Sequence, residues 1–168
     1  MFTVYFDLET GGVEPHHPTI QLAAIAIDVL GVEAGWFEQK IAFQESDADP
    51  EALQINHYNR EAWKDAISPS ASAARLSQWL RPYASVSLTS KRTGRPYNVA
   101  RIAGYNAVSF DLPRLRAMFD GSFFPCEYLC RDVLQRALFY FDEHPELEKP
   151  YNFKLSTVAQ WFGLSADG

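Results

Sequence analysis

The sequence predicts an α/β fold, with a mixed sheet flanked by helices, in a single domain. The chain has 168 residues, 47% of them hydrophobic and 14% aromatic, which suffices for one sizeable core and does not require a second domain. Three apolar, strand-like runs joined by short turn-like connections open the chain and predict an antiparallel meander. Helical and strand-like segments alternate after the meander, which is typical of α/β proteins.

The expected meander begins with residues 3–7, a β-branched and aromatic run that is closed by Gly11-Gly12. Residues 20–29 form a second, nearly all-apolar run, and residues 36–43 form the third. Because the first run is mostly apolar and lies at the start of the chain, we expect it to be a central strand of the sheet.

Capping and helix-breaking residues place the later elements. Asn59 can cap a short helix, and Ser70 or Ser72 can open a longer helix that Pro82 stops. Asp132 has the position of the first residue in a capping box. The expected helices are residues 60–66, 70–80, 109–119, 132–141 and 155–162, and the expected later strands are residues 101–105 and 128–131.

Residues 86–101 are expected to form a protruding hairpin insertion. Two β-prone stretches flank a turn-rich segment in which Gly94 lies at the turn. Lys91, Arg92 and Arg95 concentrate positive charge in this segment. The hairpin therefore either holds the phosphates of a nucleic-acid strand or is a solvated hairpin whose charges discourage edge-to-edge aggregation.

The net charge of the chain is −6, with a pI near 5.2. This balance argues against binding of nucleic acid through a large basic surface. Nucleic acid can still be a substrate, since an acidic site contributes negative charge and bound divalent metals then provide the local positive charge. The N-terminus lacks the basic region of a signal peptide, and no apolar run reaches membrane-spanning length. We expect a soluble, cytoplasmic protein with no membrane partner.

The two cysteines, Cys126 and Cys130, are expected to be reduced thiols. In an extended segment, four residues span roughly 13 Å, which exceeds the reach of a disulfide. A zinc site is not indicated, because no second Cys/His pair with ligand spacing accompanies them.

Asp7 and Glu9 are the first candidate site residues. Side chains two residues apart on a strand point to the same face, so both carboxylates should lie side by side, with Phe6 and Leu8 on the opposite face. Such a pair is stabilised by a shared proton or by a divalent cation, and oxygen ligands favour Mg²⁺ or Mn²⁺. The alternative is a solvated, polar strand end, but the central position of the strand favours the metal site.

Asp111 is the second candidate. It falls in the first turn of an expected helix, on the same stripe as Leu115 and Met118, which should face inward. A lone charge is costly there. The alternative is a carboxylate that caps free N–H groups at the helix start, and the residues alone leave both interpretations open.

Together these segments resemble a known family. The pattern Phe-Asp-Leu-Glu-Thr at residues 6–10, followed by Gly-Tyr-Asn-Ala-x-x-Phe-Asp at residues 104–111, resembles the first two motifs of the DEDDh, or DnaQ-like, 3′→5′ exonucleases. This family includes the proofreading exonuclease subunit of bacterial DNA polymerase and bacterial exonuclease I. Residues 52–57, 131–134 and 154–159 also fall where the family has comparable segments.

The resemblance implies a ribonuclease-H-like fold and an enzyme that hydrolyses nucleic acid from its 3′ end. The expected substrate is DNA rather than RNA, in single-stranded form, and the expected role is in repair, processing or proofreading. Asp7, Glu9 and Asp111 would be three of four acidic ligands of two Mg²⁺ or Mn²⁺ ions. The resemblance also allows a polymerase as a partner protein. Residues expected to contact the substrate are Thr10 and Gly11 through backbone N–H groups, Asn106 and Phe110 near the strand, and Lys91, Arg92 and Arg95 at phosphates.

Alternatives stay open for these substrate contacts. Thr10 and Gly11 could form an ordinary turn in which glycine supplies a positive φ, and Phe110 could belong to the core.

In the family, a final helix with His-x-Ala-x-x-Asp supplies the fourth acid and a general base. The 168 residues do not contain this pattern, and Asp167 does not match it. We therefore expect a domain without its final helix, with weak metal binding and poor catalysis. The alternative function is a non-catalytic nucleic-acid or protein-interaction module.

Overall fold

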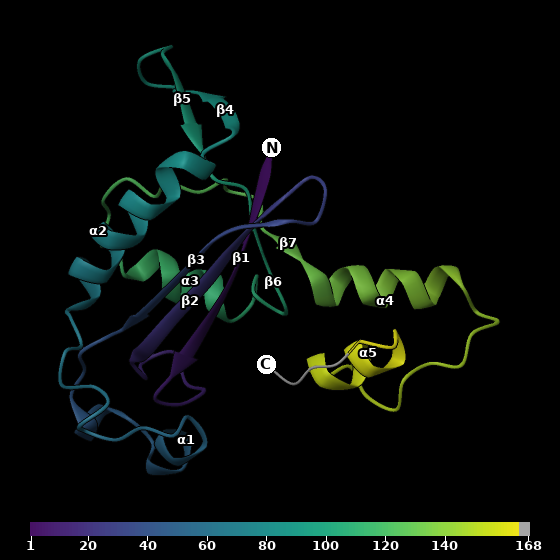
Figure 1. Cartoon of the computed structure of the whole chain (residues 1–168), viewed down its shortest axis with the longest axis horizontal. Coiled ribbons are helices and arrows are strands. Elements are labelled where there is room, and N and C mark those ends of the chain that lie inside the picture. Colours follow the sequence, from purple (N-terminus) through teal and green to yellow (C-terminus); the bar gives the residue numbers. More distant parts are fainter. Residues whose placement is uncertain (165–168) are drawn as a thin grey trace.

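The computed structural model describes residues 1–164, so Asp167 lies outside the described residues. Its centre is a five-stranded sheet in the order β3-β2-β1-β6-β7 (Figure 1). The strands β1 (Phe2–Thr10), β2 (Thr19–Asp28) and β3 (Glu33–Lys40) form the expected antiparallel meander. The strands β6 (Ile102–Gly104) and β7 (Arg131–Asp132) continue the sheet in parallel with β1. The predicted α/β class, the mixed sheet and the central position of the first strand are confirmed.

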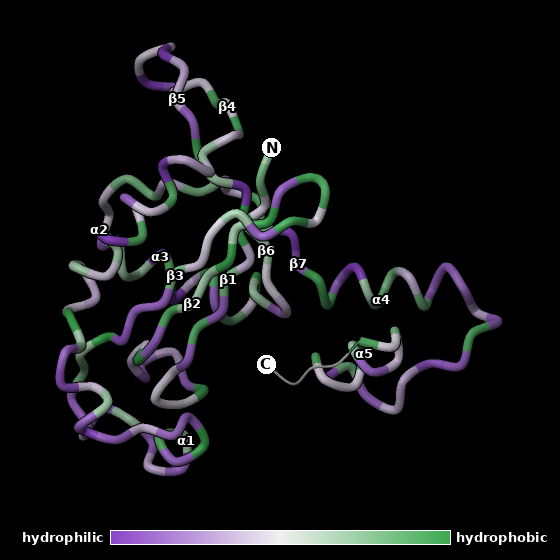
Figure 2. The backbone as a smooth tube through the Cα atoms, viewed as in Figure 1, coloured by the Kyte–Doolittle hydropathy of each residue, from purple (hydrophilic) through white to green (hydrophobic). Residues whose placement is uncertain are grey.

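The two faces of β1 differ in burial. Val4, Phe6 and Leu8 are buried, whereas the side chains between them are exposed. The buried residues pack against α2 (Pro69–Leu80) and α3 (Asp111–Ala117) in one hydrophobic core. Figure 2 shows apolar and hydrophilic residues mixed along β1, and hydrophilic residues at the tip of the β4–β5 hairpin. The core therefore lies on one side of the sheet.

The expected helix at residues 60–66 is wrong, because the segment forms successive turns. Asn59 does accept a hydrogen bond from the Ala62 N–H, as a capping residue would. The segment is instead held by contacts distant in sequence: the Trp63 indole N–H donates to the Ile20 carbonyl, and Arg60 pairs with Glu45. A short helix, α1 (Pro50–Ile55), precedes these turns and was not expected. Two short 3₁₀ helices span Glu45–Asp47 and Arg81–Tyr83.

A separate two-stranded hairpin consists of β4 (Val86–Thr89) and β5 (Pro96–Val99). It projects from the body of the molecule, and Gly94 adopts a φ of 69° in its turn (Figure 1). All residues from 91 to 95 are exposed.

The C-terminal part of the described chain is a pair of helices, α4 (Val133–Glu143) and α5 (Leu155–Trp161), that extends to one side of the sheet (Figure 1). Phe141 of α4 is fully buried and packs edge-on against Trp161 of α5. The expected strand at residues 128–131 is largely wrong, since only Arg131 and Asp132 pair with β6. Cys126 and Cys130 are free, as expected. No helix within residues 1–164 has the length and apolar character needed to cross a membrane.

Candidate active site

Strand β1 places Asp7 and Glu9 together on its exposed face. Opposite them on β2 stand Ala23 and Gln21, so no bulky apolar side chain on that strand covers the carboxylates. Burial against surrounding groups raises the pKa of Asp7 above its usual value. Burial, and then the negative charge of Asp7, raises the pKa of Glu9. The two carboxylates thus interact with each other, as the spacing in the sequence predicts.

Asp111 begins α3 and is buried, with 4% of its surface exposed. Burial, followed by the negative charge of Asp7, raises the pKa of Asp111 to about 7. A hydrogen bond from the Leu8 backbone and the positive charge of Arg114 offset only part of this rise. The fold therefore brings Asp111 to Asp7, although more than a hundred positions separate them in the sequence.

The donor atoms of these three residues suit a hard divalent cation, which prefers carboxylate oxygens. Within residues 1–164, none of the three carboxylates takes part in a salt bridge with Lys, Arg or His. No group of three or more His, Cys, Asp or Glu in that range is arranged to hold a metal ion as the side chains stand. The carboxylate oxygens of the three residues therefore suit a divalent metal ion, but the three side chains do not surround a single metal position.

The loop that leads from β6 to Asp111 turns sharply back on the sheet. Gly104 is needed at its start, because a Cβ there would lie 2.6 Å from the Ala107 Cβ and 3.0 Å from the Phe6 carbonyl oxygen. Asn106 has a φ of 56°, a left-handed conformation that is uncommon for residues other than glycine. Its side-chain oxygen accepts a hydrogen bond of 2.7 Å from the Ser109 hydroxyl. The expected substrate contact of Asn106 would compete with this local bond.

Phe110 lies at the entrance to α3 and is half-buried. The guanidinium of Arg114 lies 3.8 Å from the centre of the Phe110 ring and donates to the carbonyl oxygens of Phe110, Val13 and Glu14. Arg114 thereby ties α3 to the loop between β1 and β2. Arg114 is not among the predicted site residues, because its only local signal in the sequence is the spacing of four residues from Phe110, which puts both on one face of a helix.

Thr10 and Gly11 end β1 in a tightly bonded turn. The Thr10 hydroxyl donates to the Gly12 carbonyl at 2.8 Å, and the Gly11 N–H donates to the Pro18 carbonyl at 2.7 Å. A nucleotide contact through the Gly11 N–H would require the bond to Pro18 to break. These bonds agree with the alternative of an ordinary turn, but its positive φ, of 150°, belongs to Gly12 and not to Gly11. Glycine is required at position 11 for another reason, since a Cβ there would lie 2.7 Å from that of Ala48.

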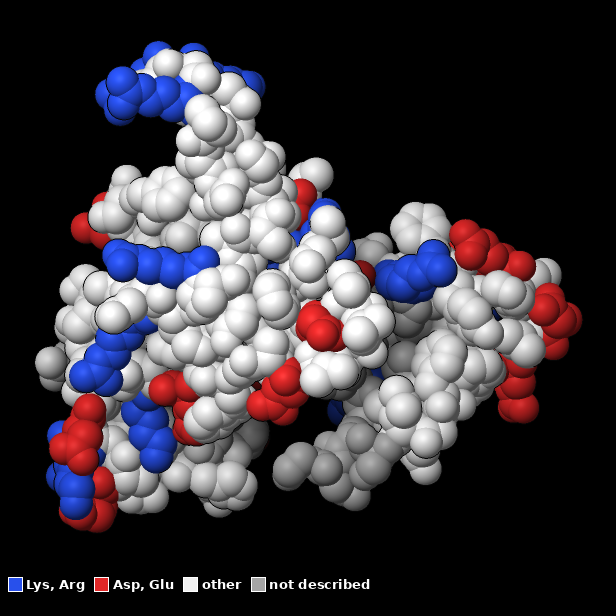
Figure 3. All heavy atoms as spheres, turned by 45° about the horizontal axis from the view of Figure 1, so that its top comes forward, with Lys and Arg blue, Asp and Glu red and all other residues white. Residues whose placement is uncertain are grey.

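The basic residues Lys91, Arg92 and Arg95 are not brought to the carboxylates. Figure 3 shows positive side chains gathered at the tip of the β4–β5 hairpin. The base of the hairpin lies at the start of β1, where the Phe2 N–H donates to the Ser85 hydroxyl. At a rise of about 3.3 Å per residue, Phe2 and Asp7 are roughly 17 Å apart along the strand. A nucleic-acid strand that touched both places would have to run along the molecule.

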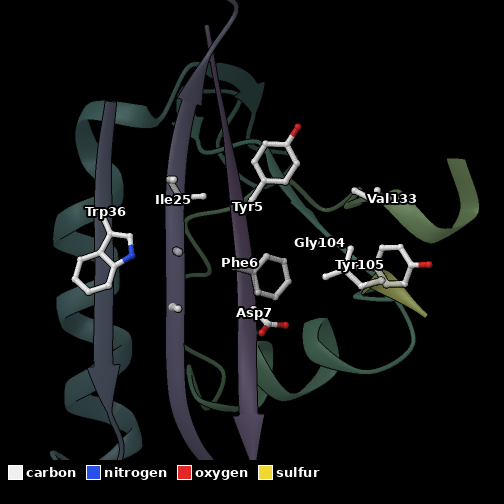
Figure 4. Close-up of a pocket in the computed structure, with 11 residues that line it drawn as sticks. Tyr5, Phe6, Asp7, Ile25, Trp36, Gly104, Tyr105 and Val133 are labelled. Atoms are coloured by element: carbon white, nitrogen blue, oxygen red, sulfur yellow. The ribbon is translucent and has the colours of Figure 1, made fainter. Parts of the chain in front are cut away.

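An open groove with a volume of about 490 Å³ lies on the exposed face of the sheet beside Asp7 (Figure 4). Tyr5 and Asp7 of β1 form its floor, with Trp36 of β3 on one side and Tyr105 and Val133 on the other. Asp7 is the one charged residue among the described residues that line it. The candidate site is thus a carboxylate at the edge of an apolar, partly aromatic groove.

No protein-family model and no curated protein matches the chain. Solved structures do share its fold. E. coli exonuclease I in complex with a dT13 oligonucleotide is 20% identical over 98% of this chain, with a TM-score of 0.73. A product-bound exonuclease I gives 20% identity over 99% of the chain and a TM-score of 0.75. A full-length 3′-exonuclease gives 10% identity over 99% and a TM-score of 0.70.

These similarities show that the chain shares the fold of exonuclease I, in agreement with the predicted ribonuclease-H-like fold. The chain spans 36% and 40% of the two exonuclease I chains and 53% of the 3′-exonuclease. At this level of identity the agreement concerns the fold of the shared portion.

Proposed function

We propose that this chain, which has the fold of exonuclease I, contains the metal-binding centre of a 3′→5′ exonuclease that acts on single-stranded DNA. The observation that carries the proposal is the buried Asp111 beside Asp7, with a pKa raised to about 7 and no salt-bridge partner within residues 1–164. A buried carboxylate facing another is unfavourable unless a proton or a cation neutralises it. Mg²⁺ or Mn²⁺ is the expected cation.

Asp7 is the shared member of the centre, because its charge acts on both Glu9 and Asp111. Asp7, Glu9 and Asp111 would hold the metal through their carboxylate oxygens. Divalent ions bound there would lower the pKa of an attacking water and stabilise the leaving 3′ oxygen. The groove beside Asp7 offers Tyr5, Trp36 and Tyr105 as largely apolar surfaces next to this carboxylate.

The 168 residues contain no His-x-Ala-x-x-Asp segment, so the general base and the fourth carboxylate have no assigned residue in this sequence. We expect weak metal binding and slow hydrolysis from the 168 residues alone. A polymerase subunit as partner and a role in DNA repair remain expectations from the resemblance, and a cytoplasmic location remains an expectation from the sequence of the N-terminus.

Metal binding and hydrolysis are tested separately. Mn²⁺ should raise the melting temperature of the wild-type chain and of Glu33→Ala, whose exposed acid lies outside the centre, but not of Asp7→Ala or Asp111→Ala. Single-stranded DNA labelled at the 3′ end should release labelled mononucleotide first, whereas 5′-labelled DNA should shorten progressively. Equal degradation by wild type and Asp7→Ala would refute the assignment of the centre.

A second function has its own observation. Within residues 1–164, no group of three or more His, Cys, Asp or Glu side chains is arranged to hold a metal ion. This arrangement would suit a non-catalytic module that binds nucleic acid or protein and retains the nuclease fold. Binding of single-stranded DNA that is unchanged by Mn²⁺ and by Asp7→Ala, without hydrolysis, would favour that function.

A further inference from the structure

Asp132 accepts hydrogen bonds from two segments of the chain. It is the N-cap of α4, where its Oδ1 accepts from the N–H groups of Leu134 at 3.0 Å and Gln135 at 3.4 Å. The same carboxylate accepts from the Asn106 N–H at 3.1 Å through Oδ1 and from the Val108 N–H at 3.1 Å through Oδ2. A helix cap needs one side-chain oxygen. The second oxygen of Asp132 is therefore used outside the helix.

The loop of residues 105–110 is the segment that these additional bonds hold. It contains Asn106 in its left-handed conformation, which persists only where the surrounding structure fixes it. Val108 lies three positions before Asp111 in the sequence. The Leu112 N–H donates to the Ala107 carbonyl at 2.8 Å, so the loop runs directly into the first turn of α3. A shift of this loop would move the Asp111 carboxylate.

The sheet fixes Asp132 itself. It pairs with Gly104 in the parallel ladder between β6 and β7, so its backbone is registered against the strand from which the loop departs. A carboxylate anchored in the sheet thus holds both the start of α4 and the loop before α3. Hydrogen bonds from N–H groups to an ionised carboxylate are stronger than those between neutral groups.

We propose that Asp132 is a positioning residue of the acidic centre: through the Asn106 and Val108 N–H groups it holds Asp111 beside Asp7. The inference deepens the proposed function and rests on it. Asp132 itself stays outside the centre, since it bonds to backbone groups and ties the geometry of the metal ligands to the first turn of α4.

Two substitutions separate positioning from capping. Asp132→Ser keeps an oxygen suited to the cap of α4, but its short side chain cannot also reach Asn106 and Val108. Asp132→Asn can keep the bonds made by Oδ1, while its amide group then faces the Val108 N–H as a second donor. The control is Ser68→Ala, which removes the cap bond to Ala71 at the start of α2.

The experiment measures Mn²⁺ affinity, metal-free melting temperature and hydrogen exchange for the four proteins. Loss of a hydrogen bond made directly to a metal ligand typically weakens metal binding by about 10- to 100-fold. Because Asp132 acts on Asp111 through the loop, we expect the lower end of this range, about tenfold, for Asp132→Ser and less for Asp132→Asn. Ser68→Ala should lower the melting temperature without changing the affinity. Exchange of the amides in residues 105–112 should accelerate most in Asp132→Ser, less in Asp132→Asn and not in Ser68→Ala.

The outcomes distinguish the two proposals. Wild-type chain that binds no Mn²⁺ refutes the metal centre, and hydrogen exchange then still decides whether Asp132 holds the loop. Unchanged exchange at residues 105–112 in Asp132→Ser overturns the positioning role in either case. Equal Mn²⁺ affinity of wild type, Asp132→Ser and Asp132→Asn overturns it as well.

Discussion

The two faces of β1 carry different tasks in the same nine residues. One face presents Val4, Phe6 and Leu8 to a core formed with α2 and α3. The other presents Tyr5, Asp7 and Glu9 to an open groove and to solvent. Burial of apolar surface stabilises the first face, whereas the second gathers like charges, which destabilises it. The fold is therefore maintained on one side of the strand, and the candidate chemistry lies on the other.

Substitutions on the two faces of β1 should therefore differ in their effects on stability and on ligand binding. Changes on the buried face should lower stability, and changes to the acids on the open face should alter ligand binding with little loss of stability or even a gain.

Phe6→Ala should be the most destabilising of the changes considered. Phe6 is 5% exposed, and truncation of a buried aromatic residue typically costs about 3–5 kcal/mol in unfolding free energy. The matched control is Tyr5→Ala on the open face, since Tyr5 is 41% exposed and should lose far less. Urea denaturation of both variants measures the difference. Similar losses in the two would show that the open face is covered in solution.

Asp111→Asn should stabilise the chain at alkaline pH. The folded pKa of Asp111 is raised to about 7, so between pH 4 and pH 7 the folded state binds more protons than the unfolded state, and the stability of the wild type falls as pH rises. The substitution removes this loss, which we place at about 2 kcal/mol after discounting the full conversion of the shift. Melting temperatures at pH 5 and pH 8 without metal measure it. If Asp111→Asn raises the melting temperature no more at pH 8 than at pH 5, the raised pKa of a buried Asp111 is contradicted.

Gly11→Ala tests the packing at the end of β1. The added Cβ would lie 2.7 Å from the Ala48 Cβ, and overpacking of this kind typically costs about 1–3 kcal/mol. Ala48→Gly removes the closest contact, so the double variant should recover part of the lost stability, although Pro18 also lies close. Chemical denaturation of the single and double variants gives the coupling. Additive effects would show that steric contact with Ala48 is not the reason for glycine.

The sequence predicts what depends on local pattern. The alternation along β1 separates Phe6 and Leu8 from Asp7 and Glu9, and the structure shows that separation. In the expected helix at residues 109–119, Asp111 lies on the inward-facing stripe with Leu115 and Met118, and this pattern likewise predicts the burial of Asp111. These features follow from periods of two and of 3.6 residues, which the sequence displays directly.

Other features depend on contacts between distant residues. The bond from Val108 to Asp132 joins positions 24 apart, and the bond from Arg114 to Val13 joins positions 101 apart. Residues 60–66 carry a helix cap at Asn59, yet the Trp63 bond to Ile20, 43 positions away, favours turns instead. Local propensity is weak beside such tertiary contacts, so the sequence alone could not foresee them.

The smallest effect on stability should come from neutralising Lys91, Arg92 and Arg95 to glutamine, because all three are exposed at the hairpin tip. If the hairpin contacts phosphates, DNA affinity should fall and the slope of log K against log salt should decrease by about 2, at roughly 0.7 per contact with a single strand. The control replaces Lys64, Lys149 and Lys154, which are exposed elsewhere and change the net charge equally. Because the hairpin lies at the end of β1 away from Asp7, oligonucleotides too short to span that distance should bind both triple variants equally, and longer ones should discriminate between them. Unchanged binding of long oligonucleotides by the hairpin variant would leave the hairpin as a solvated projection and confine substrate contact to the open face.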